Sequence, residues 1–208
     1  MDLIGMMMQT PELAALWPGL DAGRHLVTGL DGSAKTLFLA AALKKTQRQL
    51  LVVENDRYHA DELTADLTGL LGADLVWPFP VEDVLAAEVA VSSKDTVNDR
   101  INTLNWLQTG QLGIVVTSLA GLKRQLVPQT TWQQASLTLS MDSEIDPGTL
   151  AGQLVAMGYR RDDLVAAPGE FAIRGGIIDI YPLNQDDPVR IELFDTAVDS
   201  LRRFDMAT

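Results

Sequence analysis

Residues 29–36, with the sequence GLDGSAKT, contain the residue types that hold phosphate groups in nucleotide-binding loops. Such a loop, of pattern G-x-x-x-x-G-K-[ST], curls consecutive backbone N–H groups around a phosphate at the N-terminus of a helix. Its lysine reaches the β- and γ-phosphates, and its Ser or Thr hydroxyl binds Mg²⁺. The residues that we assign to this loop are Gly29, Gly32, Ser33, Ala34, Lys35 and Thr36.

Two residues of the loop oppose phosphate binding. Ala34 stands where the pattern has glycine, and its methyl group restricts the backbone and crowds an approaching phosphate. Asp31 places a negative charge beside the same cradle, and each change costs about 1 kcal/mol or more. Three interpretations stay open: a working nucleotide site, a decayed one, and an ordinary strand–turn–helix. We favour the decayed site, and therefore predict a degenerate loop and no catalytic residues.

The remaining composition offers little further chemistry. The chain has no cysteine, and its two histidines, His25 and His59, lack metal-ligand spacing, so no metal site is predicted. A net charge of −12 repels nucleic-acid phosphates, which argues against broad DNA binding by this chain alone. The sequence has neither a membrane-length apolar run nor a signal-peptide pattern, so we expect a cytoplasmic protein without a membrane partner.

Alternating strand and helix patterns surround the loop. Short apolar runs typical of strands occur at 24–30, 49–55, 73–79 (strand-like until Pro78) and 113–118. Helical patterns occur at 35–45, 56–72 and 93–110, and a short helix is expected before Pro128. This alternation predicts an α/β fold, in which residues 1–132 form a P-loop-like domain with a parallel sheet covered by helices.

The pattern changes after about residue 132. An alternating segment at 135–141 predicts a half-exposed strand, and residues 146–158 predict a helix with Asp146 as N-cap and Pro147 at its first position. Strand-rich segments at 170–182, 189–195 and 199–205 follow, separated by Gly or Pro-Asp turns. Residues 133–208 are therefore predicted to form a small α+β domain with an antiparallel sheet, with the boundary near 128–134.

The later segment, 157–205, resembles the second domain of UvrB, the helicase subunit of nucleotide excision repair. Short motifs follow one another in the order found in UvrB: Gly158-Tyr159-Arg160-Arg161-Asp162-Asp163, Gly169-Glu170-Phe171, Arg174-Gly175, Ile178-Asp179-Ile180-Tyr181-Pro182 and Ile191-Glu192-Leu193-Phe194-Asp195. The first domain extends the match, because UvrB also opens with a strand, a phosphate loop and a helix. The resemblance implies that residues 1–132 form a P-loop-like domain of the RecA or helicase type.

Two departures from UvrB point to a narrower family. The loop has Ala34 where UvrB has glycine, and the segment corresponding to UvrB's tyrosine-rich DNA-clamping hairpin (78–104) contains no tyrosine. Both features resemble the UvrB-homology module at the N-terminus of the transcription-repair coupling factors, the Mfd family. The segments WPFPVEDVLAAEVAVSSKDTVNDRINTLNWL and GIVVTSLAGLKRQLVP are similar to that family's first domain.

The resemblance implies that the chain is a fragment without ATPase activity. Further domains of the family bind RNA polymerase and DNA, and ATP and Mg²⁺ are expected only in the translocase part of the full protein. It also implies an intramolecular contact that masks this module in the intact factor. The alternative is an ATP-binding, UvrB-like helicase subunit of nucleotide excision repair.

The partner implied by the resemblance is UvrA, which UvrB binds through arginines of its second domain. The corresponding residues here are Tyr159, Arg160, Arg161, Phe171 and Arg174, whereas Ala172 replaces one arginine of the UvrB motif. Arginines recognise carboxylates in a planar, bidentate manner and are enriched at interface hot spots. From the residues alone, these arginines could instead pair with Asp162, Asp163 or Glu170 on a solvated surface.

Overall fold

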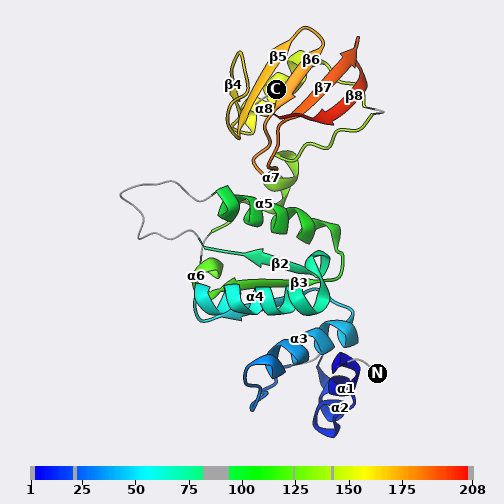
Figure 1. The fold of residues 1–208 in the computed structure, drawn as a ribbon, viewed down its shortest axis with the longest axis vertical. Helices are drawn as coiled ribbons and strands as arrows, with labels where there is room; N and C mark the ends of the chain where they lie inside the picture. The colour runs from blue at the N-terminus through cyan, green and yellow to red at the C-terminus, as the bar shows by residue number, and fades with distance from the viewer. Residues whose placement is uncertain (1–2, 21–22, 82–93, 124, 142, 206–208) are drawn as a thin grey trace. The chain divides into compact units, whose positions relative to one another are not determined.

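The computed structural model describes residues 3–20, 23–81, 94–123, 125–141 and 143–205. The chain divides into two compact units, Met1–Arg124 and Gln125–Thr208, which are described separately (Figure 1). Residues 82–93, which include much of the segment compared with the DNA-clamping hairpin of UvrB, lie outside the described residues.

The first unit is built on a parallel sheet of three strands in the order β1-β3-β2. The strands are β1 (Leu50–Glu54), β2 (Val76–Phe79) and β3 (Ile114–Ser118). Every residue of the central strand β3 is buried, as expected for an apolar strand covered on both faces. The predicted α/β class with a parallel sheet is confirmed for this unit.

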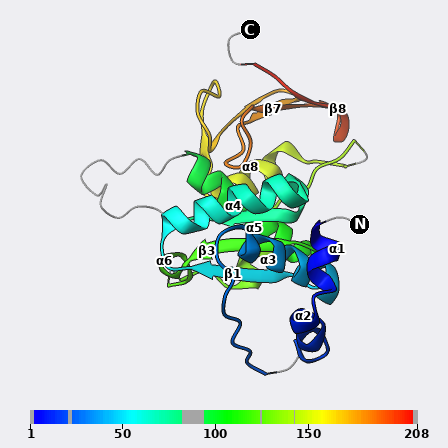
Figure 2. The ribbon, with the colours of Figure 1, turned by 60° about the horizontal axis from the view of Figure 1, so that its bottom comes forward.

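Helices cover both faces of this sheet. The unit contains α1 (Leu3–Met8), α2 (Pro11–Leu16), η1 (Trp17–Gly19), α3 (Ser33–Thr46), α4 (Arg57–Leu71), η2 (Ala73–Leu75), α5 (Lys94–Thr109) and α6 (Leu119–Leu122). Leu63 and Leu67 of α4 pack against β3 in one cluster, and Figure 2 shows α4 lying across the sheet. Trp106 of α5 packs on the opposite face and stacks on Trp77 with ring centroids 5.1 Å apart.

Two predictions for this unit are wrong. Residues 24–30 form no strand, and Leu26 in this segment is 90% exposed. The run includes Gly29, whose φ of +79° lies outside the extended conformation of a strand. Strand β2 begins three residues later than predicted and continues through Pro78. An edge position allows this, because a proline there need not donate a hydrogen bond to a neighbour.

The second unit contains a mixed sheet of five strands in the order β4-β5-β6-β7-β8. The strands are β4 (Arg160–Arg161), β5 (Glu170–Arg174), β6 (Ile177–Ile180), β7 (Val189–Phe194) and β8 (Ala197–Arg203). The pairs from β5 to β8 are antiparallel as predicted, whereas β4 runs parallel to β5.

One face of this sheet packs on the helix α8 (Pro147–Ala156), and a further helix α7 (Gln129–Gln134) precedes it. Leu150 and Leu154 of α8 join Phe171, Ile178 and Ile191 of the strands in a common core. Asp146 caps α8 as predicted, because its carboxylate accepts a hydrogen bond of 2.7 Å from the Thr149 N–H.

The predicted strand at 135–141 is wrong. The segment is irregular, and the nearest pairing is an isolated bridge between Glu144 and Ala197. Leu139 packs against the core although this segment forms no strand, so the apolar residues of the alternating pattern can be buried without strand pairing. A short alternating pattern alone is therefore not sufficient to predict a strand of this sheet.

Candidate functional site

The glycine-containing loop leads into the N-terminus of α3. Gly29 and Gly32 have φ angles of +79° and +54°, and Gly32 is the N-cap residue of the helix. These angles are readily adopted by glycine and explain its presence at both positions. The strand that precedes a phosphate loop is absent from residues 23–31, so the nucleotide-loop identity of this segment stays a prediction.

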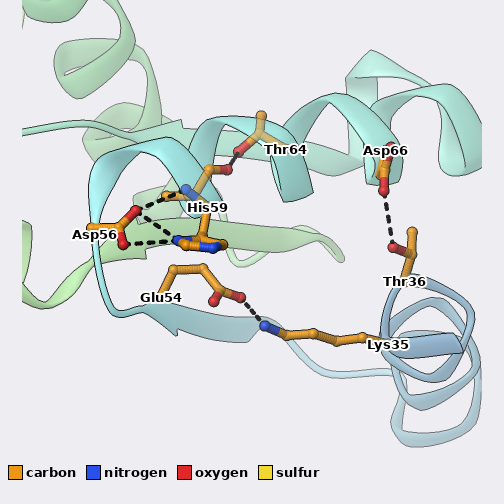
Figure 3. A network of polar contacts seen from close by, with 8 residues as sticks. Lys35, Thr36, Glu54, Asp56, His59, Thr64 and Asp66 are labelled. Carbon is orange, nitrogen blue, oxygen red and sulfur yellow. Dashed lines mark hydrogen bonds and ion pairs between the residues drawn. The ribbon is translucent and has the colours of Figure 1, made fainter. Parts of the chain in front are cut away.

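The two side chains that would contact phosphate and Mg²⁺ already have partners within the unit (Figure 3). The Lys35 ammonium forms an ion pair with the carboxylate of Glu54 at the end of β1. The Thr36 hydroxyl donates to Asp66 Oδ2 in α4 at 3.5 Å. Both partners come from other elements, so Lys35 and Thr36 tie α3 to β1 and α4.

The buried carboxylate of Glu54 explains why the Lys35 ammonium is held within the unit. Its side chain is 9% exposed, and a buried carboxylate needs a charged or hydrogen-bonded partner. The lysine supplies that partner, so an incoming phosphate would have to displace a carboxylate of like charge. Sequence reasoning assigned Glu54 no such role, because residues 35 and 54 are brought together by the fold alone.

The neighbouring residue Asp56 caps the N-terminus of α4 and also contacts the side chain of His59. The Asp56 carboxylate accepts a hydrogen bond of 3.0 Å from the backbone N–H of His59 and lies 2.8 Å from its Nδ1 (Figure 3). The backbone hydrogen bond, followed by the contact with the imidazole, lowers the pKa of Asp56. Among the described residues, no group of three or more His, Asp or Glu side chains is placed to hold a metal ion.

The predicted docking arginines lie in the second unit, on β4 and β5. Arg160 pairs with Glu170 in the strand register, and Arg161 pairs with Phe171. Because successive side chains of a strand point to opposite faces, Arg160 shares a face with Glu170 and Arg174, whereas Arg161 shares the other face with Phe171. Phe171 belongs to the core against α8. We call the face opposite α8 the outer face.

The outer face carries most of the basic residues of this unit. Residues 125–208 contain six arginines and no lysine. The strand register places four of these arginines on the outer face: Arg160, Arg174, Arg190 and Arg202. Each guanidinium group pairs with a carboxylate beneath it, and those carboxylates belong to Glu170, Asp179 and Glu192.

Glu170 holds Arg160 at one edge of the outer face. The Glu170 carboxylate accepts hydrogen bonds from the backbone N–H groups of Ala166 and Ala167, at 2.9 and 3.0 Å, and forms an ion pair with Arg160. The Ala166 bond and then the Arg160 bond lower the pKa of this carboxyl. The Glu170 side chain is 9% exposed and that of Arg160 is 71% exposed, so the guanidinium group faces solvent.

Asp179 anchors two arginines near the middle of the sheet. Its carboxylate accepts hydrogen bonds from Arg174 Nη2 at 2.7 Å, from Arg190 Nε at 2.6 Å and from Arg190 Nη2 at 2.8 Å. Asp179 is 3% exposed, whereas Arg174 is 48% exposed. Arg190 also lies over the ring of Phe204, 4.7 Å from its centroid. Sequence reasoning missed Asp179 and Arg190 as parts of this surface.

The other predicted site residues differ in accessibility. Phe171 has no exposed surface and Tyr159 is half-buried, with a hydroxyl that accepts a hydrogen bond of 3.3 Å from the Leu183 N–H. Burial raises the pKa of Tyr159. Arg161 is exposed on the edge strand, and its side chain has no hydrogen bond or ion pair with any described residue. Tyr159 and Phe171 therefore support the strands, and the arginines supply the accessible chemistry.

Comparisons with known proteins give a match to one domain model and to several longer relatives. Residues 137–208 match the model of the UvrB interaction domain. The chain is 40% identical over 198 residues, or 94% of its length, to the transcription-repair-coupling factor of Bacillus subtilis (strain 168). It is 42% identical over 183 residues, or 88% of its length, to the transcription-repair-coupling factor of Staphylococcus aureus (strain USA300).

The match covers 17% and 16% of these two relatives, so the chain spans about a sixth of the length of the curated relatives that it matches. Within the described residues, none of the helices has the length and apolar character required to cross a membrane.

Proposed function

Since the chain is homologous to transcription-repair-coupling factors and contains a UvrB interaction domain, we propose that it is a non-catalytic docking module that recruits UvrA. The observation that carries this proposal is the set of exposed guanidinium groups held over buried carboxylates on the outer face. In the cytoplasm, the module would bring the excision-repair protein to DNA lesions at which RNA polymerase has stalled.

The arrangement suits recognition of an acidic protein surface. A guanidinium group has five N–H donors in a fixed plane, and in the described residues Arg174 uses one nitrogen to bind Asp179. The buried carboxylates fix the side-chain conformations before a partner arrives, which lowers the entropy lost on binding. Arg161, which has no partner among the residues that the structure describes, presents its donors at the edge of the sheet.

Two features favour a module without nucleotide hydrolysis. Ala34 occupies the position at which a phosphate loop has glycine, and the Lys35 ammonium is paired with the buried Glu54 carboxylate. ATP and Mg²⁺ would then act in the translocase domains of the longer protein. RNA polymerase and DNA would bind other domains of that longer protein, and an intramolecular contact with the rest of the factor would mask the docking surface. The competing function is an ATP-binding, UvrB-like helicase subunit.

The proposal is tested by capture of purified UvrA on the immobilised chain. Arg161→Glu reverses an unpaired charge, and Arg174→Ala removes exposed donors while Arg190 still binds Asp179. Each change should weaken binding about tenfold or more. The matched control is Arg203→Glu, an exposed arginine on β8, which is the edge strand opposite the β4 edge that carries Arg161, and its register with Val189 places it away from the outer face. Unchanged binding by both variants, with melting temperatures preserved, would refute the proposal.

A further inference from the structure

The outer face ends at an aromatic side chain that neither the core nor the ion pairs explain. Phe194, the last residue of β7, is 79% exposed, and no large apolar side chain in the described part of the second unit is more exposed. Its neighbour Leu193 packs against the core. Strand alternation then directs Phe194 to the outer face, the face that carries the arginines.

Phe194 lies at the same end of the sheet as Arg174. The Leu193 N–H donates a hydrogen bond of 2.7 Å to the Gly176 carbonyl, within the turn that follows Arg174. Ile177, which is paired with Arg174 across the β5–β6 hairpin, adds a second partly exposed apolar side chain. Figure 1 shows the β5–β6 and β7–β8 turns at this common end.

The hairpin that carries Phe194 is fixed by hydrogen bonds at its tip. Phe194 pairs with Ala197 across a two-residue turn, in which Asp195 has a φ of +59°. The Thr196 carbonyl accepts a hydrogen bond of 2.6 Å from the Ile145 N–H, and the Val198 N–H donates to the Ser143 carbonyl at 3.1 Å. The aromatic ring is therefore held out from an ordered backbone, and little backbone entropy is lost when a partner covers it.

We infer that Phe194 is the apolar anchor of the UvrA-docking surface, with Ile177 beside it and Arg174 at its border. This inference rests on the function proposed above and adds the chemistry of the partner: an apolar pocket rimmed by carboxylates. Aromatic residues, Phe among them, and arginine are each enriched in protein–protein interfaces relative to the rest of the surface. The carboxylates of the rim would bind the donors of Arg174 that Asp179 leaves free.

The test compares Phe194→Ser with three other variants in the UvrA capture assay. Phe194→Tyr keeps the ring, and Val155→Ser removes an exposed apolar side chain from α8, on the other side of the unit. Arg174→Ala tests the proposed docking function independently of Phe194. We expect Phe194→Ser and Arg174→Ala each to weaken binding about tenfold or more, and Phe194→Tyr and Val155→Ser to bind like the unaltered chain.

The other outcomes overturn either this inference or its premise. Unchanged binding by Phe194→Ser with loss in Arg174→Ala would reject the anchor and leave the docking function standing. Loss in Phe194→Ser with normal binding by Arg174→Ala would reject a shared surface. Normal binding by both variants and by Arg161→Glu would reject the docking function. Analytical sedimentation of the chain alone tests whether a second copy of the chain covers Phe194 instead. A dimer that the Phe194→Ser substitution dissociates would show this and would contradict the inference.

Discussion

Asp179 lies between two arginine side chains, accepting hydrogen bonds of 2.7 Å from Arg174 and 2.6 Å from Arg190 while it is 3% exposed. A buried carboxylate is tolerated when its charge and lone pairs are matched in this way. The same contact fixes the positions of two guanidinium groups on the outer face. One residue thus links the stability of the sheet to the arrangement of its docking surface.

Replacing Asp179 should therefore destabilise the second unit. Asp179→Ala leaves two neighbouring cations without their shared anion, and loss of the charge-assisted hydrogen bonds that Asp179 accepts should cost about 1–3 kcal/mol. Urea unfolding followed by circular dichroism measures the change in the free energy of unfolding. The matched control is Asp199→Ala, because Asp199 is exposed in β8 and should change stability by less than about 0.5 kcal/mol. Equal effects of the two substitutions would contradict this role for Asp179.

The contact between Asp179 and Arg190 could not be predicted from the sequence, whereas the starts of two helices could. The apolar repeat of Leu63 and Leu67 predicts α4, and Asp146 with Pro147 predicts the start of α8, because capping and periodicity are local properties. Asp179 and Arg190 are eleven residues apart on different strands, and only the register of β6 with β7 brings them together. Such a register depends on packing of the whole sheet.

The wrong strand at 24–30 has a related cause. A short apolar run needs a neighbouring strand to satisfy its backbone, and that neighbour is not encoded in the run itself. The pairing of Lys35 with Glu54 is likewise a product of the fold, since it joins α3 to β1. The site residues identified from the sequence were those of a family motif, together with Glu170 as a possible partner of the arginines, whereas the partner roles of Asp179 and Glu54 were missed.

Acid should weaken the second unit partly through Glu170. Its hydrogen bonds from Ala166 and from Arg160 lower its pKa in the folded state, so the folded form binds a proton less readily than the unfolded chain. The resulting stabilisation is complete above the ordinary glutamate pKa of about 4.3 and is lost as the pH falls through the lowered value. Glu170→Gln should flatten this part of the pH dependence, as measured by thermal unfolding between about pH 3 and pH 6. A curve parallel to that of the unaltered chain would show that other carboxyls account for the acid sensitivity.

The lysine of the degenerate loop should matter for stability and not for nucleotide binding. Lys35→Met leaves the buried Glu54 carboxylate without its partner and should lower the free energy of unfolding by about 1–3 kcal/mol. Titration calorimetry with Mg-ATP should give no binding heat for the unaltered chain. Lys45→Met, at the exposed C-terminal end of α3, serves as the control for loss of a lysine. Saturable ATP binding that Lys35→Met abolishes would instead support the helicase-subunit alternative.

The two kinds of arginine on the docking unit should affect different rate constants for UvrA. Arg161 is exposed and has no partner among the described residues. Its charge should therefore attract an acidic surface of UvrA before contact and raise the association rate. Arg174 is anchored by Asp179 and would form directed hydrogen bonds in the complex. Arg161→Glu should therefore mainly lower the association rate constant and reduce its salt dependence, whereas Arg174→Ala should mainly raise the dissociation rate constant. Biolayer interferometry at several salt concentrations separates the two effects, with Arg203→Glu as the charge-matched control. If both variants changed only dissociation, Arg161 would have to lie inside the contact and not at its border.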